Sequence, residues 1–252
     1  MSIASEITRL QQAKSDLATS ITNKGVTVPA ATTLDGYAAL VDQIQQGGTP
    51  LPYDAEIEYL ESTGTQWINT GVTPSPNIVV TIDFVRTDNS TFSALFGWRY
   101  YKSSPGRRVC FAFIPKLSSG NNYWQLEVGR DVVNSSTEIP LNTFSTLVMS
   151  YTSTKVTCGS STKTVSHSGK VWDAEFEIGD MLLFSRGTIS TDSSVPFIGK
   201  VYACTIKYSD LLVRDFIPVR VGQVGYMYDK VSGELFGNVG TGSFTLGPDV
   251  GT

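Results

Sequence analysis

The spacing of the apolar residues changes once along this chain, at the segment "QQGGTPLP" over residues 45–52. Before this segment apolar residues recur every three or four positions, as on one face of a helix. After it they alternate, as in a half-buried β-strand. Paired glycines followed by two prolines are typical of a connection between elements. We therefore predict a helical segment over residues 1–46, a Gly/Pro linker over residues 47–52 and a β domain over residues 53–252.

Residues 3–23 carry a heptad pattern, which predicts a helix with one apolar seam. This helix is expected to stop at Gly25, which can adopt the left-handed conformation, and Pro29 blocks its continuation. A second helix is expected from Thr32, because Thr32 and Asp35 match a capping box. The predicted seams of the two helices contain Ile3, Ile7, Leu10, Leu17, Ile21, Leu34, Tyr37, Val41 and Ile44, with Lys14 at one further core position.

A helical hairpin of about 45 residues has too little core to be stable alone. Its seam residues are therefore predicted to be buried against copies of the same chain. The alternative is that the hairpin packs on the β domain of its own chain. In simple parallel coiled coils, isoleucine alternating with leucine around a core lysine favours two strands, but the hairpin leaves the number of copies open.

Beyond residue 52 the sequence alternates in the manner of β-strands. In "NIVVTIDFVR" the residues Ile78, Val80, Ile82 and Phe84 share one face, and "FIGKVYACTIKYSD" is predicted to place Tyr202 on one face with its apolar neighbours. Further strands are predicted near residues 92–98, 107–114, 123–128, 144–151, 175–184 and 212–219. The predicted fold class is mainly β, an antiparallel β-sandwich or jelly roll preceded by an α-helical hairpin.

Charge and composition exclude several classes of function. The formal net charge is -4 and the basic residues are scattered, so binding to duplex nucleic acid is not expected. Three widely spaced cysteines and one histidine predict neither a disulfide framework nor a metal site. No cofactor is predicted, although calcium near Asp180 is left open. The chain lacks a secretion signal and a membrane-spanning window, so no membrane insertion is predicted. If the protein acts outside the cell that makes it, it is expected to leave by lysis or within a particle.

Two acidic clusters resemble the carboxylate pairs of glycoside hydrolases. In "EIEYLE", Glu56, Glu58 and Glu61 are spaced like the strand that carries the nucleophile and acid of one family of retaining glucanases. Here, however, the central residue is glutamate and the motif begins the β domain. The cluster at residues 173–177 places its carboxylates on one strand face, which a solvated outer face explains. We therefore predict no catalytic residue and no enzyme, with a polysaccharide hydrolase as the least favoured alternative.

Aromatic residues gather in or beside two predicted loops. Tryptophan or tyrosine beside asparagine and arginine suits a sugar ring, which has an apolar C–H face edged with hydroxyls, and binding residues concentrate in loops on rigid scaffolds. The predicted ligand-binding residues are Trp98, Tyr100, Tyr101, Arg107, Asn121, Asn122 and Trp124. Trp67, in the alternating "TQWINTG", is predicted to lie in the core.

Two long stretches resemble known families. The segment "AKSDLATSITNKGVTVPAATTLDGYAALVDQI" resembles the helical segment that precedes diverse β domains in tail and fibre proteins of phages and prophages. The remainder, from "EIEYLESTGTQWINTGV" to "GYMYDKVSGELFGNVGTGSF", resembles a concanavalin A-like (laminin G-like) lectin domain carried by phages of gut bacteria. The resemblance implies a trimer, a place on a virion and a host surface glycan as ligand. It implies no catalytic set, and makes "EIEYLE" part of the first strands.

The leading hypothesis from the sequence is a non-enzymatic receptor-binding protein of a phage tail or fibre. Its helices would oligomerise or dock on other virion proteins, and its lectin-like sandwich would attach to carbohydrate on the host surface. The alternative is a structural decoration or baseplate component that contacts only other virion proteins.

Overall fold

The computed structural model of the protein describes residues 3–22, 24, 26–43, 51–88, 93–102, 107–115, 123–168, 172, 179–188 and 196–251, except for the side chains at positions 42, 101, 102, 107 and 108. The chain forms two compact units, Met1–Leu51 and Pro52–Thr252. The boundary between the units falls within the stretch that the sequence suggests as a linker.

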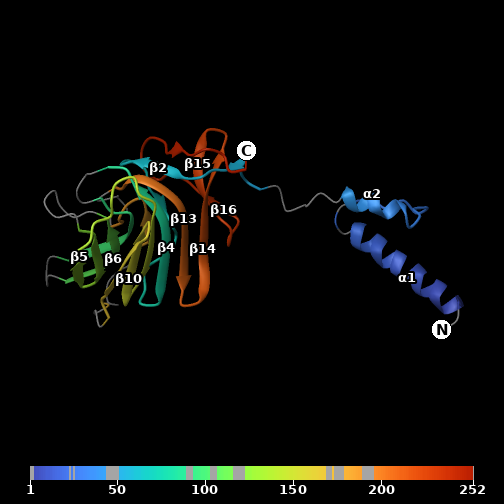
Figure 1. Ribbon diagram of the computed structural model, residues 1–252, viewed down its shortest axis with the longest axis horizontal. Helices are drawn as coiled ribbons and strands as arrows, with labels where there is room; N and C mark the ends of the chain where they lie inside the picture. Colours follow the sequence, from blue (N-terminus) through green and yellow to red (C-terminus); the bar gives the residue numbers. More distant parts are fainter. Residues whose placement is uncertain are drawn as a thin grey trace. The chain divides into compact units, whose positions relative to one another are not determined.

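The described residues of the first unit form two helices, α1 (Ile3–Thr22) and α2 (Gly36–Asp42) (Figure 1). The extent of α1 agrees with the heptad pattern to within one residue. Tyr37 of α2 is buried and its hydroxyl donates a hydrogen bond to the Lys14 carbonyl at 3.4 Å, which ties the two helices together. Within the described residues, neither helix is long and apolar enough to cross a membrane.

The predicted capping box at Thr32 and Asp35 is wrong. The second helix begins at Gly36, and the side chain of Asp35 makes no capping hydrogen bond. The Thr32 hydroxyl donates instead to the Pro29 carbonyl at 2.7 Å, so this residue closes the preceding turn. A threonine that bonds to a nearby carbonyl favours a turn over a helix start.

Most of the predicted seam residues have no covering element in the helical unit. The exposed seam residues are Ile3, Ile7, Leu10, Leu17, Leu34 and Val41. Ile21 and Tyr37 are buried in the hairpin, so they are not available to a partner as the heptad pattern suggested. Ile44 lies outside the described residues. One complete heptad position of α1, formed by Ile3, Leu10 and Leu17, thus stays exposed along the whole helix.

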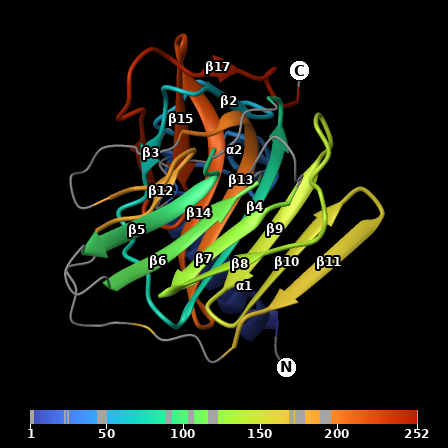
Figure 2. The same ribbon diagram turned by 90° about the vertical axis from the view of Figure 1, so that its left-hand side faces the viewer.

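The second unit is a sandwich of two antiparallel sheets (Figure 2). The eleven-stranded sheet has the order β11-β10-β9-β4-β13-β14-β15-β16, with β1 paired to β14 and β2 paired to β13 and β17. Its strands are β1 (Ala55–Glu56), β2 (Leu60–Thr63), β4 (Ile78–Arg86), β9 (Ser145–Ser150), β10 (Ser153–Cys158), β11 (Ser161–Ser166), β13 (Ile198–Tyr208), β14 (Leu211–Val221), β15 (Val224–Asp229), β16 (Glu234–Phe236) and β17 (Thr245–Leu246). The six-stranded sheet has the order β3-β12-β5-β6-β7-β8. Its strands are β3 (Ile68–Asn69), β5 (Phe96–Lys102), β6 (Arg107–Ile114), β7 (Gln125–Gly129), β8 (Asp131–Asn134) and β12 (Leu182–Leu183).

The core fills the space between the two sheets. Alternate residues of β4, from Ile78 to Phe84, point inward and are fully buried. The ring of Phe84 lies 6.2 Å from that of Phe113 on β6, and Phe113 in turn lies 5.6 Å from Trp124, so aromatic contacts join the sheets. This architecture confirms the predicted fold class, an antiparallel β-sandwich with a preceding helical segment.

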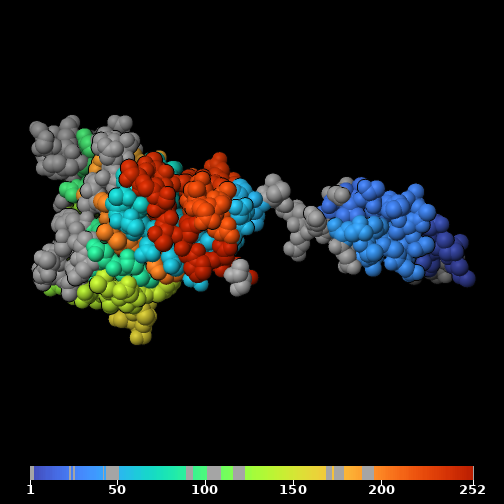
Figure 3. Space-filling view, turned by 90° about the horizontal axis from the view of Figure 1, so that it is seen from above, coloured from blue at the N-terminus to red at the C-terminus, as the bar shows by residue number. Residues whose placement is uncertain are grey.

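The second and the last strands of the sandwich lie side by side. Strand β2 pairs with β17, and Figure 3 shows the cyan and red segments adjacent on the surface of this unit. Arg220 on β14 donates to both carboxylate oxygens of Asp249, at 2.7 and 2.6 Å, and fastens the chain end. The stretch "EIEYLESTGTQWINTG" therefore forms the first strands of the sandwich, as the sequence suggested.

Candidate functional site

The two predicted ligand-binding tryptophans are buried. Trp98 on β5 is 0% exposed, and its ring stacks on Tyr100 with centroids 6.3 Å apart. Trp124, just before β7, is 1% exposed. Neither indole presents an open face to solvent, so a surface position beside a loop is wrong for both side chains, whereas their part in ligand binding stays a prediction. Trp67, expected in the core, is partly buried and packs against it.

Among the predicted ligand-binding residues whose side chains the structure describes, Tyr100 and Trp124 lie toward opposite ends of the six-stranded sheet. In the pairing of β5 with β6, Tyr100 faces Val109 and Tyr101 faces Arg108, at the start of β6, whereas Ile114 at its end pairs with Gln125, next to Trp124. Six residue steps along β6 separate Arg108 from Ile114, roughly 20 Å. The side chains of Tyr101 and Arg107, and the whole of Asn121 and Asn122, lie outside the described part of the structure.

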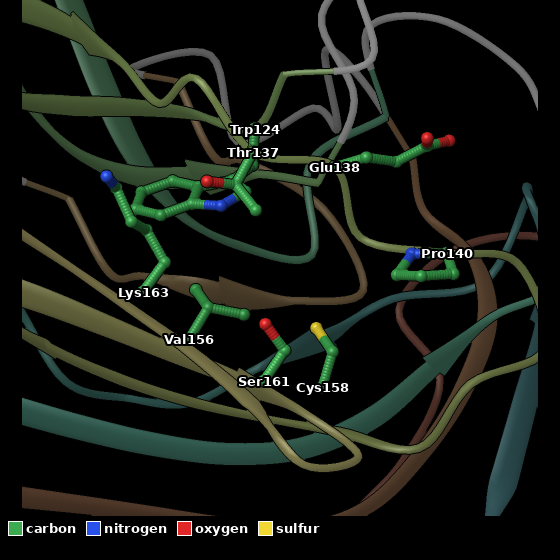
Figure 4. Close-up of a pocket in the computed structure, with 8 residues that line it drawn as sticks. All are labelled: Trp124, Thr137, Glu138, Pro140, Val156, Cys158, Ser161 and Lys163. Carbon is green, nitrogen blue, oxygen red and sulfur yellow. The ribbon is translucent and has the colours of Figure 1, made fainter.

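The Trp124 end of the six-stranded sheet does border a pocket (Figure 4). Its volume is about 130 Å³. The residues that line it are Trp124, Thr137, Glu138, Pro140, Val156, Cys158, Ser161 and Lys163. They come from the residue just before β7, the loop between β8 and β9, and the hairpin of β10 and β11. We refer to this cavity as the Trp124 pocket.

The hairpin register explains which side chains face the pocket. Val156 of β10 pairs with Lys163 of β11, and Cys158 pairs with Ser161. Cross-strand partners lie on the same face of a sheet, so Lys163 and Ser161 are brought to the side on which Val156 is buried. Lys155, one residue earlier, points to the opposite face.

The loop that supplies Thr137 and Glu138 is held by a buried arginine. Arg86, only 1% exposed, donates from Nη2 to the Ile139 carbonyl at 2.6 Å, and its own carbonyl accepts from the Asn142 amide at 2.9 Å. Burial lowers the pKa of Arg86, whereas the charges of Glu138 and Asp88 raise it. Because both the guanidinium and the backbone of Arg86 bind this loop, the pocket wall formed by Thr137 and Glu138 is fixed to the core strand β4.

The acidic motif does not lie on a single strand. Glu56 belongs to β1 and accepts a hydrogen bond from the Tyr53 hydroxyl at 3.0 Å. Glu61 belongs to β2, where its cross-strand neighbour in the sheet register is Lys200 of β13. Glu56 and Glu61 therefore lie on different strands. Residues 173–178 lie outside the described residues. Asp180 is described, yet no group of three or more histidine, cysteine, aspartate or glutamate residues suited to a metal ion occurs in the described part of the chain.

A second surface, which the sequence reasoning missed, lies on the outer face of the eleven-stranded sheet. The ring of Tyr202 contacts Phe144 at 5.2 Å and Tyr59 at 5.4 Å, both edge to face, and the Lys200 ammonium lies 4.0 Å above the Tyr59 ring. Phe144 is 51% exposed. The prediction that Tyr202 shares a face with the apolar residues of β13 is wrong, because a register shift between Val201 and Ala203 turns it outward.

Fold and pocket together define the class of protein: a helical unit joined to an antiparallel β-sandwich that carries a small, partly aromatic and partly polar pocket. No family model and no curated protein matches the chain. A suggested carbohydrate-binding protein from Bacteroides ovatus ATCC 8483 is a structural neighbour, with a TM-score of 0.47 and 10% identity, covering 78% of this chain and 61% of its own. The chain thus spans less than two thirds of that protein. The native heptameric SAP-like pentraxin of Limulus polyphemus has a TM-score of 0.42 and 12% identity, covering 79% and 96% of the respective chains.

Proposed function

We propose that the chain is a non-enzymatic, multivalent carbohydrate-binding protein that attaches a phage particle to sugars on the host surface. The observation that carries this proposal is the contrast between its two units. The sandwich has a complete core, whereas α1 leaves Ile3, Leu10 and Leu17 exposed at one heptad position. An exposed apolar seam of this length favours association with copies of the same helix.

The Trp124 pocket supplies the binding part of the proposal. Its wall offers the edge of an indole and the side chains of Val156 and Pro140 for apolar C–H groups, and the hydroxyls of Thr137 and Ser161 for hydrogen bonds. One pocket of this size binds weakly. Several pockets on one oligomer would multiply the apparent affinity on a surface with many sugars.

The place on a virion rests on the resemblance of the N-terminal segment to phage tail and fibre proteins. In this role the helical unit would assemble the oligomer or dock on other virion proteins, and the sandwich would face the host. The molecular mass of the purified protein in solution would show whether two or three copies assemble.

The structural alternative, a component that contacts only other virion proteins, is favoured by one specific observation. Phe144 and Leu141 are exposed apolar residues in the loop before β9, beside the aromatic surface of Tyr202 and Tyr59. Such a surface suits a protein partner. Under this alternative the protein binds no glycan, and Phe144→Ser releases it from purified particles.

The test is binding of the full chain to intact bacterial cells and to a bacterial glycan array, with the pocket filled by mutation. Ser161→Trp places an indole in the pocket from an exposed hairpin position, and Thr164→Trp adds the same side chain to the opposite face of β11. We expect Ser161→Trp to abolish glycan binding and Thr164→Trp to leave it unchanged. Equal binding by both variants, or no binding by the unmodified chain, contradicts the proposal.

The absence of catalysis is tested on whichever polysaccharide the array identifies. We expect its chain length to stay constant during long incubation with the protein. Shortening that disappears in Glu58→Gln would show a hydrolase instead.

A further inference from the structure

Two charged side chains, Glu138 and Lys163, line the Trp124 pocket, and they differ in whether a described residue of opposite charge lies near them. The Glu138 carboxylate lies 3.8 Å from Nη2 of the buried Arg86, so a cation already neutralises part of its charge. Lys163, on the opposite wall, is half-buried and forms no ion pair or hydrogen bond with any described residue. Figure 4 shows the Lys163 ammonium near one end of the Trp124 indole and the Glu138 carboxylate on the other side. The end of the pocket at Lys163 is therefore electropositive.

The size of the pocket limits what can enter it. Ligand pockets that enclose a whole small molecule have volumes of about 300 Å³ or more. The Trp124 pocket, at about 130 Å³, accepts a substituent of a sugar and not the complete ring with its neighbours. The substituent must pair with one ammonium and with the hydroxyls of Thr137 and Ser161, while its carbon skeleton contacts Val156 and the indole.

We propose that the Trp124 pocket binds the carboxylate of an acidic sugar, with Lys163 as its ionic partner. This inference rests on the proposed function and names the class of glycan. A carboxylate carries the single negative charge that one lysine can balance, and its two oxygens can accept from the lysine and a hydroxyl together. A doubly charged group would also meet the Glu138 carboxylate at the rim.

The position of Lys163 gives the ion pair more weight than a surface pair has. A fully exposed pair contributes little, because water screens both charges. Lys163 is half-buried beside an apolar wall, where charge interactions are stronger. A hydrogen bond to a charged group contributes about 1.5–3 kcal/mol, which corresponds to a change of roughly 10- to 100-fold in Kd.

The experiment compares each acidic ligand with its own neutral form. The full chain is titrated with oligosaccharides that contain glucuronate or sialate, and with the same oligosaccharides after their carboxylates have been reduced to primary alcohols. We expect the unmodified chain to bind the acidic forms at least about tenfold more tightly. Lys163→Gln should remove this preference, and Lys163→Arg should keep most of it. Lys155→Gln, which removes the same charge from the outer face of the same hairpin, should leave the preference unchanged.

The outcomes separate this inference from the proposed function. Equal binding of acidic and reduced ligands overturns the acidic-sugar inference and leaves carbohydrate binding intact. A preference for acidic ligands that survives in Lys163→Gln also overturns it, because the charge would be recognised elsewhere. Failure to bind any ligand of the array overturns both.

Discussion

At the scale of single residues, a buried carboxylate on the outer face of the six-stranded sheet is held by two arginines. Glu127 on β7 is 2% exposed and accepts two 2.8 Å hydrogen bonds from Arg186, while Arg99 of β5 donates to it at 3.2 Å. The three side chains join β5, β7 and the segment after β12. Removing one partner of such a buried group leaves the other charges without compensation.

We expect Glu127→Gln to lower the free energy of unfolding by about 3–5 kcal/mol. Urea unfolding followed by tryptophan fluorescence measures this change. Glu58→Gln is the matched control, because Glu58 is exposed and such substitutions usually change stability by less than about 0.5 kcal/mol. Equal stabilities of the two variants would show that the Glu127 cluster contributes no net stability.

A second residue-scale prediction concerns alkaline pH. Burial, together with the hydrogen bond to Glu56 and its charge, raises the pKa of Tyr53 to about 12 from the usual 10.0. The folded state therefore favours the neutral phenol, and this stabilisation is complete below pH 10 and is lost as the pH rises toward 12. In a tyrosinate absorbance titration, Tyr53→Phe should remove one component near pH 12, and Glu56→Gln should move it to lower pH. An unchanged titration curve for Tyr53→Phe would contradict the assignment.

At the scale of strands, the close approach of β5 and β6 depends on a glycine. Gly97 has a φ of +136°, and a Cβ atom there would lie 2.3 Å from the Phe111 carbonyl oxygen and 2.5 Å from the Ala112 Cβ. The two contacted atoms are a backbone oxygen of β6 and the Cβ of Ala112, neither of which can move away without shifting the β6 backbone. Gly222, also with a positive φ, has open space at the same point.

We therefore expect Gly97→Ala to destabilise the sandwich by more than about 1 kcal/mol, and Gly222→Ala to cost only the strain of its own positive φ. Differential scanning calorimetry of the two variants measures the difference in Tm. If Gly97→Ala melted no lower than Gly222→Ala, the steric limit on the β5–β6 pairing would be disproved.

The strands also show what could be predicted from sequence and what could not. Strong apolar alternation located β4, β6, β9, β13 and β14 to within a few residues. The hairpin of β10 and β11 was missed, because "STKVTCGSSTKTVS" is rich in serine and threonine and carries few apolar residues. That hairpin supplies half of the Trp124 pocket, so the site could not be assembled from the sequence.

The direction in which an aromatic side chain points was the other limit. Phe96, Trp98 and Tyr100 share one face of β5, and a shift of one residue would expose all of them, so alternation alone does not say which face is inside. The extra residue in β13 turned Tyr202 outward for a related reason. Polar neighbours in the sequence suggested a surface position for Trp98 and Trp124. In the structure both lie in the core, where Trp98 is the cross-strand neighbour of Phe111 and the Trp124 ring contacts Phe113.

At the scale of the whole molecule, the two units differ in how completely they bury their apolar side chains. The sandwich buries its own core, whereas no described residue of the helical unit covers its exposed seam of Ile3, Leu10 and Leu17. We propose that a second copy of the helix covers it. Replacing Leu10 and Leu17 with serine in the full chain should therefore reduce the proposed oligomer to monomers and leave the unfolding of the sandwich unchanged. Light scattering gives the mass, and Ala13→Ser, an exposed change outside the seam, is the control.

Comparison of the Leu10→Ser/Leu17→Ser variant with the unmodified chain also tests whether oligomerisation raises the apparent affinity for a glycan-coated surface. Each pocket in the Leu10→Ser/Leu17→Ser variant keeps its affinity for a free oligosaccharide, because the seam lies in the other unit. On a surface coated densely with the same glycan, the unmodified oligomer can engage several pockets at once, which raises the apparent affinity by about 100-fold or more. We therefore expect the seam variant to lose this advantage on the surface and nothing in solution. Equal surface affinities for a monomeric seam variant and the unmodified oligomer would show that the copies assemble for a purpose other than attachment.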